Sequence, residues 1–296
     1  FWAPWKLRVV LETTRYAEIM SRLLRGTYGA DAGDPLWAHP HGALEDGVWA
    51  HVDRVGFRVA DDDDHHNEPP QPPPERRRRR RPAQRSLTPH LDCCPDAMHR
   101  SPHRWRPIQC LLALSGGLGP DEGGFECVPG FHREFGAYYE QRASRGTFPK
   151  DDPTTLPCVG DFIAVSARDD AGLLRRFRHI RVPPGAALFW DRRIPHANAR
   201  RNTSRVPRRV LYGGFLPRGP PLNAAYARAQ LARLRTAAPQ PDFWIDDDEA
   251  APAWDGDDDD AVQGPAASTP TTFLATLSPH ARRLLGVDEF DEVAPS

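Results

Sequence analysis

Apolar side chains recur every three or four positions between residues 14 and 25, as they do along one face of an α-helix. They are Tyr16, Ile19, Met20, Leu23 and Leu24. Thr13 and Thr14 are suitable helix caps, and Gly26 is a typical stop. The pattern predicts a helix over 14–25 that docks its apolar stripe on a larger body.

Two further stretches near the end of the chain have helical character. Residues 224–235 are rich in alanine, arginine and leucine, which favour helices. Ser278 and Pro279 are a typical helix start, and Gly286 is a typical end. Residues 1–10, in contrast, combine aromatic and aliphatic side chains that indicate an edge segment packed on the body of the protein.

Shorter apolar runs bounded by glycine and proline predict β-strands. One of them follows a Pro-Gly turn at residues 184–185 and ends just before His196. The predicted strands are residues 56–59, 108–115, 125–128, 162–165, 179–182 and 186–190. We therefore expect a mainly β fold with flanking helices.

Charge and proline content divide the chain further. Of its 296 residues 32 are proline, and only 39% are hydrophobic. The net charge of −1 hides acidic runs at residues 61–64, 246–249 and 257–260, and six consecutive arginines from Arg76 to Arg81. Such runs cannot bury enough apolar surface to become ordered. We expect a solvated insertion over 61–85 and an acidic linker before the last helix.

The same composition argues against several classes of protein. No apolar run approaches the ~18 residues that cross a bilayer, so we expect no membrane partner. Five cysteines, with Cys93 and Cys94 adjacent, form no spaced disulfide framework, which indicates reduced thiols and a cytoplasmic or nuclear protein. The run from Arg76 to Arg81 could attract nucleic acid or an acidic partner, but a solvated loop is the favoured interpretation.

Candidate metal ligands lie at two places in the predicted β region. His90 and Asp92 are two residues apart, and side chains of extended backbone alternate with a period of two, so both point to one face. His196 offers a second imidazole after the last predicted strand. Two histidines and one carboxylate with open positions form the ligand set of non-haem Fe(II) oxygenases.

Other histidines compete with this interpretation. Rivals in loop-like sequence are His39, His41, His65, His66, His99 and His103. Of these, His99 and His103 are near enough to the proposed ligands to contact a substrate. We expect structural roles for His132, which follows a turn, and for His179, which lies in a predicted strand.

Four motifs occur in an order that is typical of one family. They are His90-Leu91-Asp92, the segment from Gly123 to His132, the segment from Gly185 to His196, and the polar turn at Asn202 that precedes Arg208. Over residues 88–217 the chain thus resembles the phytanoyl-CoA dioxygenase-like family of iron- and 2-oxoglutarate-dependent oxygenases. Ala197, Asn198 and the insertion before the metal strand differ from its best-known members, so an acyl-CoA substrate is not implied.

The resemblance implies a fold and a division of the chain. The core, residues 86–220, would form a double-stranded β-helix, which is a jelly-roll barrel of the cupin type. Residues 1–60 would supply an N-terminal helix and edge strands that pack on the barrel. The insertion over 61–85 would precede the core, and residues 221–296 would supply C-terminal helices and the acidic linker.

The resemblance also implies a chemistry. Fe(II) would be held by His90, Asp92 and His196, with ascorbate as reductant. With dioxygen, 2-oxoglutarate would yield succinate and carbon dioxide while a C–H bond of a small-molecule substrate is hydroxylated. Asp92 disfavours halogenation, which requires a small residue in its place. The arginine that binds the far carboxylate of 2-oxoglutarate would be Arg208, with Arg209 as its rival, because only one of two neighbouring strand residues points inward.

Two hypotheses from other classes remain open. A non-catalytic, cupin-like protein that binds a metal or another ligand would share the barrel and the histidines but would need no arginine at position 208. A scaffold would bind nucleic acid through Arg76 to Arg81, with a strong dependence on salt. Succinate formation tests the first alternative, and deletion of the six arginines tests the second.

Overall fold

The computed structural model describes residues 4–28, 47–60, 89–92, 106–116, 118–138, 163–165, 167–168, 170–204, 206–236 and 270–291. The chain divides into two compact units. Unit 1 comprises Phe1–Asp53, Pro95–Gln109 and Gly213–Ser296, and unit 2 comprises Arg54–Cys94 and Cys110–Tyr212. The predicted insertion over 61–85, with its arginine run, and the acidic runs at 246–249 and 257–260 lie outside the described residues.

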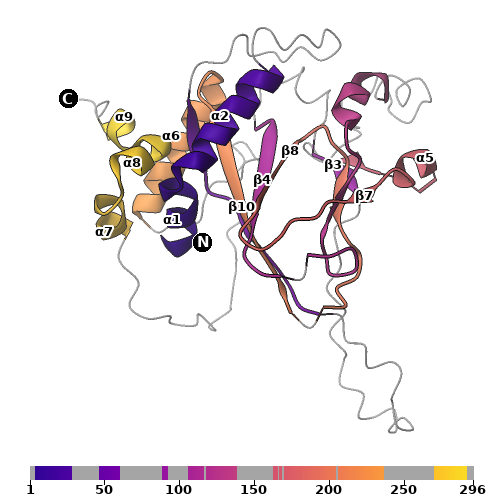
Figure 1. Cartoon of the computed structure of the whole chain (residues 1–296). Helices are drawn as coiled ribbons and strands as arrows, with labels where there is room; N and C mark the ends of the chain where they lie inside the picture. The colour runs from indigo at the N-terminus through magenta and orange to yellow at the C-terminus, as the bar shows by residue number, and fades with distance from the viewer. Residues whose placement is uncertain are drawn as a thin grey trace, which may run out of the picture. The chain divides into compact units, whose positions relative to one another are not determined.

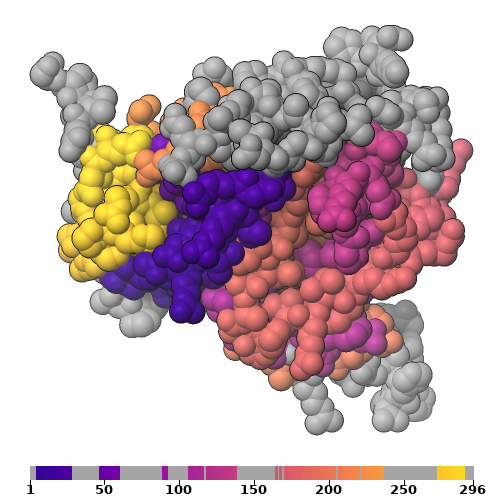
Figure 2. Space-filling view, turned by 45° about the horizontal axis from the view of Figure 1, so that its top comes forward, coloured from indigo at the N-terminus to yellow at the C-terminus, as the bar shows by residue number. Residues whose placement is uncertain are grey.

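The helices of unit 1 come from both ends of the chain. They are α1 (Pro4–Glu12), α2 (Thr14–Tyr28), α6 (Pro221–Arg235), α7 (Pro270–Ala275), α8 (Pro279–Leu285) and α9 (Val287–Asp291). Figure 1 shows them gathered together, and Figure 2 shows the N-terminal helices (indigo) against the C-terminal ones (yellow), with α1 touching α8. No helix in the described ranges has both the length and the apolar character needed to cross a membrane.

Helix α1 corrects the expectation of an edge segment over residues 1–10. Leu7, Val10 and Leu11 are all buried, and their spacing is that of one helix face. Aromatic and β-branched residues favour strands in isolation, but burial of this stripe decides the local structure. The helix predicted over 14–25 is confirmed as α2, which continues to Tyr28.

Strand β1 (Val48–His51) and the end of β10 (Arg208–Pro217) belong to unit 1. They pair antiparallel, with Trp49 opposite Leu216. Gln230 of α6 covers the free edge of β1, because its side chain donates to the carbonyl of Ala50 and accepts from the amide of Val52. An edge strand that is bonded in this way no longer offers those groups to another chain.

Unit 2 contains strands of two sheets. One sheet has the order β6 (Ile163–Ala164), β3 (His90–Leu91), β9 (His196–Asn198), β5 (Phe125–Cys127) and β7 (Arg178–His179). Its neighbouring strands pair antiparallel. The other sheet has the order β1, β10, β4 (Ile108–Ala113) and β8 (Ala187–Asp191), and β2 (Val55–Arg58) also pairs antiparallel with β10. The short helices η2 (Phe131–Arg133) and α5 (Ala171–Leu174) lie between strands.

One hydrophobic cluster takes side chains from both sheets of unit 2. Its buried members are Leu111, Ala113, Leu118, Phe125, Cys127, Val182, Trp190 and Val210. Strands β4, β8 and β10 contribute from one sheet, and β5 contributes from the other. The described part of the chain is thus mostly antiparallel sheet with flanking helices, as predicted. Its strands do not close into a barrel, and the jelly-roll topology stays a prediction.

Candidate metal centre

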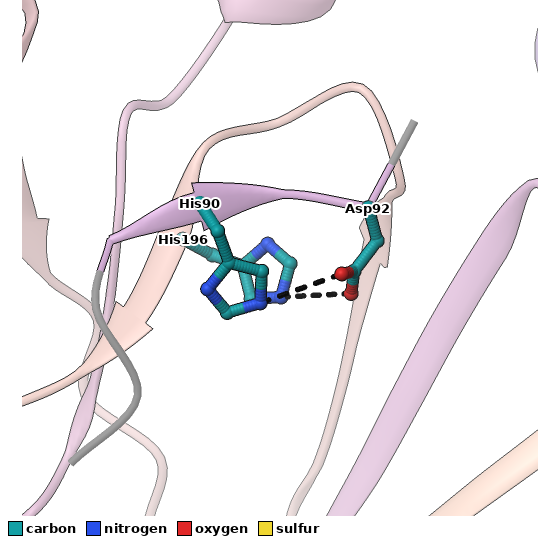
Figure 3. A group of neighbouring side chains, drawn as sticks. All are labelled: His90, Asp92 and His196. Atoms are coloured by element: carbon teal, nitrogen blue, oxygen red, sulfur yellow. Dashed lines mark ion pairs between the residues drawn. The ribbon is translucent and has the colours of Figure 1, made fainter. Parts of the chain in front are cut away.

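The pairing of β3 with β9 brings two distant histidines together. His90 lies directly opposite His196 in this antiparallel pair, and residues that are directly opposite have their side chains on the same face. Asp92 follows His90 by two positions and shares that face. Figure 3 shows both imidazole rings and the carboxylate converging on one place.

The separations between the donor atoms suit a shared ion. His90 Nε2 lies 3.4 Å from Asp92 Oδ1, and His196 Nε2 lies 3.4 Å from Asp92 Oδ2. Both separations exceed the usual N–H···O hydrogen-bond range of about 2.7–3.2 Å. Neighbouring ligands about 2.1 Å from a common ion lie about 3 Å apart. The three residues can therefore hold a metal ion, and they form the one such group of His, Cys, Asp or Glu among the described residues.

Packing and one hydrogen bond orient the His196 ring. His196 Nδ1 lies 3.0 Å from the carbonyl oxygen of Ile194, which can only accept, so Nδ1 carries the hydrogen. That assignment leaves the lone pair of Nε2, which lies 3.4 Å from Asp92 Oδ2, available to bind a metal ion. Phe125 stacks on the ring at a centroid distance of 5.7 Å, and Trp190 contacts it at 5.3 Å. Both His90 and His196 are buried.

Cys127 is a buried thiol in the same sheet. It lies opposite His196 in the pairing of β5 with β9. Burial raises the pKa of the Cys127 thiol to about 11, so the thiol is protonated at neutral pH. In that form it packs as a small apolar side chain in the hydrophobic cluster.

The two arginines at the start of β10 have opposite surroundings. Arg208 is buried, whereas Arg209 is exposed. Arg208 Nη2 donates to Asn198 Oδ1 at 2.7 Å and to Tyr212 Oη at 3.3 Å. Its Nε has no hydrogen-bond partner among the described residues. A buried cation with only neutral partners and one unused N–H is suited to an anionic ligand.

Two glycines make room for the Arg208 side chain. A Cβ atom on Gly56 would lie 3.0 Å from Arg208 Nη1 and 2.9 Å from a ring carbon of Tyr212. A Cβ atom on Gly123, where φ is +73°, would lie 3.1 Å from Arg208 Cδ. A larger residue at position 56 would also meet Val210 Cγ2 at 2.7 Å, so Val210, Tyr212 or the guanidinium would have to move.

Strand β9 connects Arg208 to the candidate metal-ligating group, which consists of His90, Asp92 and His196. Asn198, which holds Arg208, follows His196 by two positions and projects from the same face. Side chains so related are about 7 Å apart along a strand. The Arg208 guanidinium is thus linked through one side chain, Asn198, to the strand that carries His196.

The sequence did not identify Asn198, Tyr212 or Gly56 as residues of the site. Alternation along a strand could have identified Asn198, two positions after His196, and Tyr212, four positions after Arg208. Gly56 had no such signal, because its role depends on a contact across the sheet.

The remaining sequence candidates lie away from the metal-ligating group or are not described. His179 lies on β7 opposite Glu126, whose pKa is raised by burial, and His132 lies in η2. The rivals His39, His41, His65, His66, His99 and His103 lie outside the described residues.

Neither a protein-family model nor a curated protein sequence matches this chain. Two crystal structures of the hypothetical protein JW0805 from Escherichia coli are similar to it, with TM-scores of 0.61 (at high pH) and 0.60 and 18% identity. The alignments cover 97% of this chain and 68% and 69% of those chains. The crystal structure of GlcNAc Inducible Gene 2, GIG2 (DUF1479), from Candida albicans has a TM-score of 0.61 and 14% identity, over 97% of this chain and 65% of that one. At these identities the likeness establishes a shared fold.

Proposed function

We propose that this chain is a non-haem Fe(II)- and 2-oxoglutarate-dependent dioxygenase, similar to the phytanoyl-CoA dioxygenase-like family. It would hydroxylate a C–H bond of a small-molecule substrate and release succinate and carbon dioxide. The observation that carries the proposal is the arrangement on one face of β9. His196 belongs to the metal-ligating group there, and Asn198 holds the buried Arg208 two positions further on.

The donor set supports iron. Two imidazoles and one carboxylate would occupy three positions of Fe(II) and leave the others open for co-substrate and dioxygen. Bound iron would supply the activation of dioxygen for oxidation of the substrate. His90, Asp92 and His196 would hold it, and Ile194 and Phe125 would keep the His196 ring in place.

Arg208 would bind the far carboxylate of 2-oxoglutarate. Its planar guanidinium matches a carboxylate in charge and shape, and its Nε is an unused donor. Tyr212 would orient the guanidinium through its hydroxyl group. Buried Phe125 and Trp190 would exclude water from this side of the site.

The proposal also includes the topology of unit 2. We infer that unit 2 is a double-stranded β-helix in which two antiparallel sheets enclose the site. The hydrophobic cluster shared by both sheets of unit 2 supports this topology. The motifs from His90 to Arg208 follow one another along the chain in the order expected of that fold.

Succinate formation tests the proposal. Purified protein with Fe(II), ascorbate and 2-oxoglutarate should form succinate slowly even without substrate, because the co-substrate is oxidised in the uncoupled reaction. His90→Ala should abolish succinate formation. His280→Ala, which removes a histidine from α8 in unit 1, should keep it.

Two outcomes would contradict the proposal. Wild-type protein that binds a divalent metal but never consumes 2-oxoglutarate would favour the non-catalytic metal-binding protein. Succinate formation that is equal in wild type and His90→Ala would show that the activity does not come from this site.

A further inference from the structure

The backbone of Asp92 lies just beyond the paired part of its strand. Strand β3 ends at Leu91, and among the described residues its pairs with β6 and β9 involve His90 and Leu91. The carbonyl oxygen of Asp92 accepts a hydrogen bond from Arg192 Nε at 2.8 Å. A side chain from elsewhere in unit 2 thus supplies the kind of bond that a neighbouring strand would otherwise supply.

Arg192 is an unusual residue for this task because it is almost completely buried. Only 2% of its surface is exposed, and it is among the largest fully buried side chains of the described residues. A buried guanidinium is costly unless its N–H groups are bonded, so a purely structural position would more commonly hold an apolar residue. The bond from Nε to the Asp92 carbonyl oxygen satisfies one of these N–H groups.

Arg192 belongs to the connection between β8 and β9, which is itself held firmly. The Asp191 carboxylate accepts bonds from Arg193 Nε and Nη2, each at 3.0 Å, and the amide of Ile194 donates to the Asp191 carbonyl. The Ile194 carbonyl in turn accepts the bond from His196 Nδ1. A single five-residue turn, residues 191–195, therefore contacts two of the three ligand residues.

We propose that Arg192 is a positioning residue for the metal-ligating group. It fixes the end of β3, and with it the Asp92 carboxylate, relative to His196, whose ring is oriented by the same turn. The inference rests on the proposed metal site and extends it to a residue that contacts no metal. Partners of metal ligands typically contribute about 10- to 100-fold to metal affinity.

The test measures the affinity for Mn(II), a stand-in for Fe(II) that is stable in air, by electron paramagnetic resonance without 2-oxoglutarate. Arg192→Met should weaken Mn(II) binding roughly 10- to 100-fold. Arg192→Lys should also bind more weakly than wild type, because lysine places a methylene group where arginine has Nε. Arg106→Met is the matched control. It removes another buried arginine, which bonds Asp53 in unit 1, and should leave the affinity unchanged.

Circular dichroism at each titration temperature confirms that the variants are folded. Wild-type Mn(II) affinity in a folded Arg192→Met protein would overturn the inference, and so would an equal loss of affinity in Arg106→Met. If Arg192→Met does not fold, Arg192→Lys decides in the same way. A wild-type protein that does not bind Mn(II) would instead contradict the proposed function, so the two failures are distinguishable.

Discussion

Arg208 and Arg209 differ by one position in sequence and have opposite environments. Arg208→Met should raise the KM for 2-oxoglutarate in the uncoupled reaction, because a charge-assisted hydrogen bond contributes about 1.5–3 kcal/mol. At about 1.4 kcal/mol for each factor of ten, the expected increase is roughly 10- to 100-fold. Arg209→Met removes an exposed guanidinium and should leave this KM unchanged.

Mn(II) affinity in the same two variants separates co-substrate binding from damage to the metal-ligating group. Both variants should bind Mn(II) as wild type does. A similar rise in KM for both would mean that neither arginine has a specific role. A rise in Arg209→Met alone would assign the co-substrate to the rival residue.

The residues that sequence alone could identify are those related by a local period. The period of two predicts that His90 and Asp92 share a face, and the same argument leaves only one inward arginine at the start of β10. Arg192 could not be found in this way, since its bond partner is 100 residues distant in sequence. In sequence, a buried arginine also looks the same as an exposed one.

At the scale of elements, helices with strong end signals were predictable. Ser278 caps α8 by accepting from the amide of Ala281 at 3.2 Å, and Gly286 ends the helix at a φ of 71°, as expected from sequence. Helix α1 also begins with a proline, Pro4, but no Ser, Thr, Asp or Asn precedes it and no glycine follows its end, and its first turn carries an exposed Trp5 that indicated a different structure. Its helical spacing is clear only once the buried face is known.

Helix α8 is also joined to α1 by Glu12, and this contact has a predictable pH dependence. Burial acts to raise the pKa of Glu12, but hydrogen bonds from the hydroxyl and amide of Ser278 outweigh it and hold the pKa below its usual value. A lowered folded-state pKa gives stability that is present above the unfolded pKa and is lost as pH falls through the folded value. The contact should therefore stabilise unit 1 at neutral pH. Its contribution should weaken below about pH 4.5, which is the ordinary pKa of a glutamate carboxyl group.

Urea unfolding between pH 7 and pH 3 measures this contribution. Glu12→Gln should be less stable than wild type at pH 7, and the difference should shrink as the pH falls. Glu18→Gln changes an exposed residue of α2 and should stay within about 0.5 kcal/mol of wild type throughout. Parallel pH profiles for wild type and Glu12→Gln would contradict the assignment.

At the scale of the whole molecule, each unit is assembled from separate stretches of the chain. Unit 1 takes residues from the beginning, the middle and the end of the sequence, and β10 starts in unit 2 and finishes in unit 1. Long-range strand pairing determines which of these segments belong together, and such pairing has no local signal in the sequence. All residues of the metal-ligating group, together with Arg192 and Arg208, nevertheless belong to unit 2.

That placement predicts where metal binding should alter stability. A ligand at 100 times its Kd stabilises the form that binds it by about 2.7 kcal/mol, so any opening that breaks the site should become roughly 100-fold rarer. Two amides of unit 2 report on such openings, since Val128 N–H donates to Pro195 and Ala199 N–H donates to Gly124. Saturating Mn(II) should slow hydrogen exchange at both amides. In unit 1 the exchange rate of the Val52 amide, which is bonded to Gln230, should change much less under conditions where exchange occurs by local opening.

His90→Ala is the control, and it should abolish the protection of both amides by Mn(II). Slower exchange that persists in this variant would mean that Mn(II) binds elsewhere on the protein.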